Sequence, residues 1–185
     1  MLKKSMPLHC LSLAALLSVL LLTVQPAPAG QVLDEQYGPD GAKVELVKAK
    51  IRNGVLTLAV RYTHPAEVLS LNGKHPSINQ RARRIPIKFK VNSVFYIAAG
   101  KRYHVLKDKE GNWLAAPVAG DYIAGPADKD WLEKAKKQNK IPALFLSEGH
   151  PIQIIWFKFP APPEGVDEIE FQIPEVSPFD VEIKR

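Results

Sequence analysis

Apolar and polar residues alternate along most of the chain after residue 43, and this two-residue period is typical of half-buried β-strands. In one run, Ile87 and Phe89 face one side while Lys88 and Lys90 face the other, so we expect the lysine side to be exposed to solvent. We expect strands over residues 44–51, 55–62, 85–91, 93–97, 103–106, 141–146, 152–159, 168–173 and 179–183. The residues predicted to face the core include Leu56, Leu58, Val60, Tyr62, Ile87, Phe89, Phe171 and Val181.

Turn signals separate these strands. Asn53-Gly54 lies between the first two, and this pair favours a tight hairpin because both central positions need positive φ. A second hairpin is expected around residues 98–102 with Gly100 at its tip, and residues 107–112 predict a further turn. A proline-rich corner at 160–163 ends one strand, because proline lacks the ladder donor, and carries the chain to another sheet.

Short strands with such corners predict an all-β fold, an antiparallel sandwich of seven or more strands, over residues 43–185. Residues 30–42 have no period and are predicted to form a lead-in arm. The segment 128–140 breaks the β pattern: Asp128 could cap a short surface helix whose acidic residues come early and lysines late.

The first 29 residues have the pattern of a cleaved signal peptide. Lys3 and Lys4 precede an apolar run over residues 11–24, and Ala27-Pro28-Ala29 supplies the small residues that a signal peptidase requires. The apolar run is shorter than the roughly 20 residues of a membrane span. We therefore expect a periplasmic or secreted protein without a transmembrane segment after processing.

The charge and the cysteine content argue against several classes of function. The formal net charge is +6, and loss of Lys3 and Lys4 with the leader would lower it to +4, which is too little for a dedicated nucleic-acid-binding protein. The only cysteine, Cys10, would leave with the leader. The mature protein would then have no disulfide, thiol nucleophile or cysteine metal site.

Two groups of motifs resemble a known family. The first is the Tyr103-x-x-Leu106-x-Asp108-x-x-Gly111 hairpin. The second comprises the Phe159-Pro-Ala-Pro-Pro corner and the final Ile173-Pro-x-x-x-Pro-Phe sequence. Together they resemble exported bacterial Ig-like β-sandwich domains of the telokin-like kind, over residues 43–183. Members usually have no assigned function, so the resemblance implies an Ig-like fold and export but no chemistry. The lysine-rich segment 128–140 departs from the family pattern as an insertion.

Basic residues form the strongest candidate binding feature. The candidate basic face comprises Arg81, Arg83, Arg84, Lys88, Lys90, Lys101 and Arg102, to which Lys134, Lys136, Lys137 and Lys140 could add. One interpretation is a solvated strand face whose lysines discourage edge-to-edge pairing. The other is a patch that binds an anionic envelope partner, either a protein, a glycan or a lipid headgroup.

Catalytic and metal sites have weaker signals. His64, His75 and His150 each precede a proline and could share a zinc ion if their loops met, but no metal-binding spacing is present, so no cofactor is predicted. The serines lack a Gly-x-Ser-x-Gly elbow, and acids such as Asp108 and Asp121 fall in expected turns. Alternation places most aromatic residues in the core and leaves Trp131 as the one that looks exposed.

The sequence thus favours an exported, non-enzymatic binding or accessory protein of the bacterial cell envelope. Two alternatives stay open: a structural subunit of an envelope assembly, and a hydrolase with an unrecognised site.

Overall fold

The structure is a computed structural model that describes residues 31–124, 138 and 143–184. Its strands are β1 (Asp34–Tyr37), β2 (Lys43–Arg52), β3 (Val55–Thr63), β4 (Ile85–Ile87), β5 (Phe89–Lys90), β6 (Phe95–Ala98), β7 (Lys101–His104), β8 (Ala115–Ala116), β9 (Val118–Ala119), β10 (Tyr122–Ile123), β11 (Leu144–Leu146), β12 (Ile152–Pro160), β13 (Glu168–Gln172) and β14 (Phe179–Glu182). The helices are α1 (Pro65–Leu71) and α2 (Ile78–Ala82), with the short 3-10 turns η1 (Pro39–Gly41) and η2 (Val91–Ser93).

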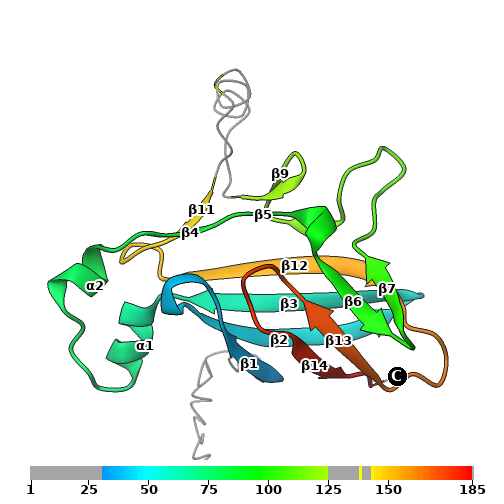
Figure 1. The fold of residues 1–185 in the computed structure, drawn as a ribbon, viewed down its shortest axis with the longest axis horizontal. Helices are drawn as coiled ribbons and strands as arrows, with labels where there is room; N and C mark the ends of the chain where they lie inside the picture. Colours follow the sequence, from blue (N-terminus) through cyan, green and yellow to red (C-terminus); the bar gives the residue numbers. More distant parts are fainter. Residues whose placement is uncertain (1–30, 125–137, 139–142, 185) are drawn as a thin grey trace, which may run out of the picture.

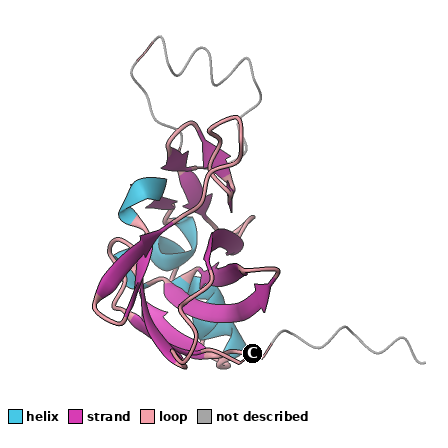
Figure 2. Ribbon diagram, turned by 90° about the vertical axis from the view of Figure 1, so that its right-hand side faces the viewer, coloured by secondary structure: helices cyan, strands magenta, loops and turns pink. Residues whose placement is uncertain are grey.

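The fold is an all-β, sandwich-like arrangement of antiparallel sheets, as the alternation predicts. A five-stranded sheet has the order β1-β2-β3-β12-β8, and a four-stranded sheet has the order β14-β13-β6-β7. Figure 1 shows the four-stranded sheet in front of the five-stranded one, with α1 and α2 at one end. Smaller sheets, β5-β10-β9 and β11-β4, close the upper side. Figure 2 shows that strands (magenta) take up more of the ribbon than helices (cyan).

Aromatic rings from both sheets form the centre of the core. Phe157 and Phe159 project inward from β12, and the rings of both lie against Phe171 of β13 at centroid distances of 6.0 and 5.8 Å. Tyr96 of β6 meets Phe159 edge-on at 5.5 Å. All four side chains are fully buried, so each contributes about 1.5–3 kcal/mol or more through loss of apolar surface to water. The eight residues predicted to face the core are all buried.

Both predicted hairpins are present. Asn53 and Gly54 have φ angles of 51° and 73° and join β2 to β3, so the positive-φ requirement is met at both positions. The second hairpin turns at Ala99 and Gly100, with φ angles of 47° and 73°. The second strand of this hairpin lies two residues earlier than expected, because β7 spans Lys101–His104 rather than residues 103–106. The corner after Pro160 also carries the chain from the five-stranded to the four-stranded sheet.

Several further segments differ from the sequence prediction, and β8, β9 and β10 form where no strand was predicted. The expected arm contains β1, whose polar residues have no apolar period because it is an edge strand bonded only to β2. The expected strand 85–91 has the predicted alternation of burial, but it divides into β4 and β5, which pair with different strands, β11 and β10. The expected strand 93–97 begins only at Phe95, because residues 91–93 form η2.

The two helices lie between the predicted strands 55–62 and 85–91, where the sequence analysis predicted no element. Proline at the first position and a buried histidine cap begin α1, and a capping box between Ser77 and Gln80 begins α2. Both helices are too short for a clear 3.6-residue period. The helix predicted over 128–140 lies outside the described residues, apart from Gln138.

An ion network connects the first three strands of the five-stranded sheet. The buried carboxylate of Glu45 accepts a hydrogen bond from Arg61 Nε at 2.7 Å and contacts Lys43 Nζ at 2.9 Å, and Lys43 also meets Glu35 at 2.8 Å. Burial alone would raise the pKa of Glu45, but its two cationic partners outweigh burial and hold the pKa below its ordinary value. Hydrogen bonds to Glu35 and Glu45 raise the pKa of Lys43.

Two buried tyrosines differ in how their hydroxyl groups are satisfied. Tyr96 donates to the carbonyl of Pro160 at 2.9 Å and so links the two sheets at the proline corner. The hydroxyl of Tyr62 has no hydrogen-bond partner among the described residues. Burial raises the pKa of both phenols, so both stay protonated at neutral pH.

The ion network predicts a pH-dependent contribution to stability. At pH 7, Glu45→Gln should lower the free energy of unfolding by about 1–3 kcal/mol, because Arg61 and Lys43 lose a buried charged acceptor. The folded-state pKa of Glu45 is lowered, so its contribution exists above the ordinary value of 4.5 and is lost as the pH falls further. Urea unfolding at pH 7 and pH 3 measures this difference. If Glu45→Gln lowered the free energy of unfolding equally at both pH values, an ionic role of Glu45 would be contradicted.

The two tyrosines form a matched pair of tests. Tyr62→Phe should leave the free energy of unfolding unchanged or raise it by up to about 1 kcal/mol, because it removes an unsatisfied buried hydroxyl. Tyr96→Phe should lower it by about 1 kcal/mol, because the Pro160 carbonyl loses its donor. Urea titrations followed by tryptophan fluorescence compare them. A clear loss in Tyr62→Phe would mean that its hydroxyl is hydrogen-bonded in solution.

Candidate functional site

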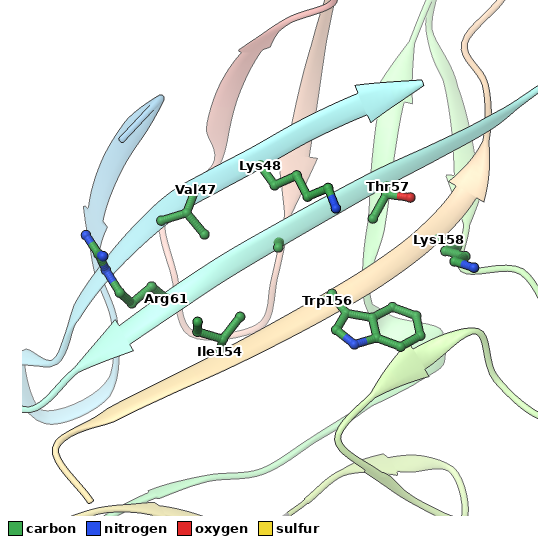
Figure 3. A pocket seen from close by; sticks show the side chains of 8 residues that line it. Val47, Lys48, Thr57, Arg61, Ile154, Trp156 and Lys158 are labelled. Carbon is green, nitrogen blue, oxygen red and sulfur yellow. The ribbon is translucent and has the colours of Figure 1, made fainter. Parts of the chain in front are cut away.

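The outward face of the five-stranded sheet carries a hollow of about 570 Å³, which we call the outer groove. Its floor lies on β3, where Thr57 and Ala59 point outward between longer side chains on β2 and β12. The groove exists because these two central side chains are small. Figure 3 shows the larger side chains that border it, with Val47 on one side and Ile154 and Trp156 on the other.

Cross-strand register places three lysines around this floor. Lys50 and Lys158 both pair with Thr57, one from each side, and Lys48 pairs with Ala59 in the next row. Neighbouring strands lie about 4.8 Å apart, so the backbones of Lys50 and Lys158 are separated by roughly 10 Å. No ion pair within 4 Å involves these rim lysines (Lys48, Lys50 and Lys158) in the part of the chain that the structure describes.

Trp156 forms the aromatic wall of the outer groove. It pairs with Ala59 on one side and with Ala116 on the other, and its ring is half-buried. The ammonium group of Lys158 lies 5.7 Å from the ring centroid, within the range of a cation–π contact. Trp131, which the sequence predicted to be the exposed aromatic residue, lies outside the described residues, whereas Trp156 faces outward between the inward-facing Ile155 and Phe157.

An apolar strip continues from the groove toward α1. Ile154 and Ile152 follow Trp156 on the same face of β12 and are 56 % and 45 % exposed. A second hollow of about 300 Å³ lies between Ile152 and Leu71 of α1. Arg61 borders both hollows and is held there by Glu45, so the groove has a fixed cation at this end. The charge of Arg61 is balanced, whereas the rim lysines leave the other end positive.

The structure divides the candidate basic face that the sequence predicted. Arg81 lies on α2, and Lys101 and Arg102 lie on β7, at opposite ends of the long axis in Figure 1. Lys88 lies between β4 and β5, and Lys90 ends β5. These residues therefore do not form one continuous patch.

Several of these cations have local structural partners. Arg83 forms an ion pair with Asp40 of η1, and its carbonyl contacts the buried His64 ring at 2.9 Å. Arg84 lies over the ring of Phe145 at 4.2 Å, and Arg102 lies over Phe95 at 4.6 Å. Such contacts stabilise the segments that carry these residues.

The three histidines have separate environments. His64 is buried and uses both ring nitrogens: Nδ1 accepts from the amide of Ala66 at 3.1 Å and Nε2 contacts the Arg83 carbonyl. His64 thus caps α1. His75 and His150 are exposed in loops. Among the described residues, no group of three or more histidine, cysteine or acidic side chains is placed to hold a metal ion.

The turn acids and serines also have local roles. The Asp108 carboxylate accepts from the amides of Glu110 and Asn112 at 2.9 and 2.8 Å, and these bonds, with that from the Asn112 side chain, lower its pKa. Asp121 accepts from the Trp113 indole at 2.8 Å. Ser77 caps α2. Asp128 and Asp130 lie outside the described residues.

The rim lysines and Trp156 were missed because candidate residues were grouped by nearness in sequence. A usable signal was nevertheless present. The Asn53-Gly54 turn pairs Arg52 with Val55, so Lys50 must lie opposite Thr57. Beyond this pair a β-bulge at Val47 shifts the register, and no local pattern predicts it.

In the described part of the chain, no helix has the length and apolar character needed to cross a bilayer. No protein-family model, curated protein or solved structure matches this chain. The resemblance to telokin-like Ig domains therefore stays a prediction.

Proposed function

We propose that this protein is an exported, non-enzymatic binding protein of the bacterial envelope that engages an acidic partner through the outer groove. The observation that carries the proposal is the set of three rim lysines. Lys48 and Lys158 line an aromatic-walled hollow, and Lys50 lies beside it by its register opposite Thr57. None of the three has an ion-pair partner among the described residues. Cations around a partly apolar floor suit a partner that carries carboxylates or other anions on an apolar framework.

The composition of the groove supports binding rather than catalysis. Its outward side chains are lysine, arginine, threonine and apolar residues, so it holds no carboxylate or imidazole for proton transfer at neutral pH. Glu45, which lines the neighbouring hollow, already forms ion pairs with Arg61 and Lys43. An open, shallow cationic surface of this kind favours an extended partner over a small enclosed substrate.

Export is part of the proposal and is supported by the sequence. The basic start, the short apolar run and the Ala27-Pro28-Ala29 site have the order of a signal peptide. Export is compatible with the cysteine-free mature chain, because that chain has no thiol that an oxidising compartment could convert to a disulfide.

Binding of a polycarboxylate probe tests the proposed function. Fluorescently labelled poly-L-glutamate should bind the purified protein at about 50 mM salt and bind much more weakly at about 300 mM, because screening shortens the reach of the lysine charges. The variant Lys48→Ala, Lys50→Ala, Lys158→Ala should weaken binding about tenfold or more at low salt. Fluorescence anisotropy measures both effects.

The matched control removes three exposed lysines elsewhere: Lys88, Lys101 and Lys109, each changed to alanine. It changes the net charge equally and should retain most of the affinity. Equal losses in the two variants would show a response to net charge alone and would contradict a role for the groove, as would binding that is insensitive to salt.

A further inference from the structure

Four carboxylates occupy adjacent positions on the outward face of the four-stranded sheet. Glu168 pairs directly with Glu182, and Glu170 pairs with Asp180 in the next row. Their neighbours Ile169, Phe171, Val181 and Phe179 are buried, so the acidic residues all project away from the core. We call these four residues the acidic ladder.

Among the described residues, the acidic ladder has one cation beside it, Lys184, which borders the same hollow as Asp180 and Glu182. None of the four carboxylates belongs to an ion pair in this described part of the chain. Like charges directly opposite each other on neighbouring strands are destabilising, because their Cβ atoms lie only about 4.5–5.5 Å apart. Arg102, on the far side of Ile97 in the same sheet, lies over the Phe95 ring instead. The ladder is therefore a surface that a cationic partner would stabilise.

The rim lysines have the matching charge on the opposite side of the molecule. In a sandwich the outward faces of the two sheets point in opposite directions, so one copy cannot bring its lysines to its own acidic ladder (Figure 1). Rows along a strand face repeat about every 6.8 Å in both sheets, and lysine stems are long enough to adapt across strands. Two copies stacked in the same orientation would bring the two sets together.

We propose that the acidic partner of the outer groove is the acidic ladder of a second copy of this chain. The inference rests on the proposed function, since it names the partner of the same site. The contact joins two different faces and leaves one of each unoccupied at the ends, so it is heterologous and builds open, head-to-tail chains rather than a closed dimer. This geometry favours a structural subunit of an envelope assembly.

Reciprocal charge reversal tests the inference. In sedimentation velocity, the wild-type protein should show a weight-average mass that rises with concentration at about 50 mM salt and returns to the monomer at about 500 mM. Replacement of all three rim lysines by glutamate should give a monomer at low salt, because both outward faces are then acidic.

A second variant reverses the other face: Glu168→Lys, Asp180→Lys and Glu182→Lys. It should also be monomeric alone, because both faces are then basic. A 1:1 mixture of the two variants should associate again, since each basic face meets an acidic one. A wild-type protein that stays monomeric at low salt, or a mixture that does not associate, would overturn the inference.

Two controls separate this inference from the proposed function and from misfolding. Circular dichroism should give the same spectrum and a similar Tm for both variants, and restored association of the mixture itself requires folded proteins. Lys88→Glu, Lys101→Glu, Lys109→Glu should associate like the wild type. A monomeric wild type that still binds poly-L-glutamate through the rim lysines would overturn self-association alone. Loss of both properties would overturn both proposals.

Discussion

Pairing of β12 with β3 along the full length of β12 is the interaction on which the rest of the structure depends. It fixes the register from Ile152 opposite Thr63 to Pro160 opposite Val55. Because successive side chains alternate between faces, this register places Phe157 and Phe159 in the core. It equally requires Trp156 and Lys158 to face outward. The aromatic core and the outer groove are thus two consequences of one strand pairing, and a slip by one residue would exchange them.

Much of the fold could be predicted from the sequence because its strongest signals are local. The alternation around Phe89 and Phe171, the Asn53-Gly54 turn and the proline corner each depend on a few neighbouring residues, and each is present in the structure. The Ig-like class that the sequence suggested concerns the connection of strands, and the structure supports the coarser, sandwich-like architecture. Topology depends on contacts between distant segments, which a single sequence does not reveal.

The candidate site was less predictable for the same physical reason. A groove on a sheet is made by residues from three strands, so its detection requires the cross-strand register and the side-chain sizes together. Ala59 is inconspicuous in the sequence, yet its small size between Lys48 and Trp156 creates much of the hollow. Conversely, arginines that are close in sequence, such as Arg83 and Arg84, have different partners and do not act together. Strand β1 was not predicted for a related reason, since an edge strand can be polar on both faces.

The distribution of charge on the two outward faces argues for a role beyond stabilising the monomer. On the five-stranded sheet, Glu45 is surrounded by opposite charges, which shows that the fold accommodates alternating signs where they stabilise strand pairing. Two rows away, Lys50 and Lys158 flank a neutral Thr57. On the other sheet, Glu168 lies opposite Glu182. Mixed charges at these positions would stabilise each sheet and keep the surface soluble. Like charges gathered on one face lack that stabilisation. An oppositely charged molecule that binds to the face would supply it.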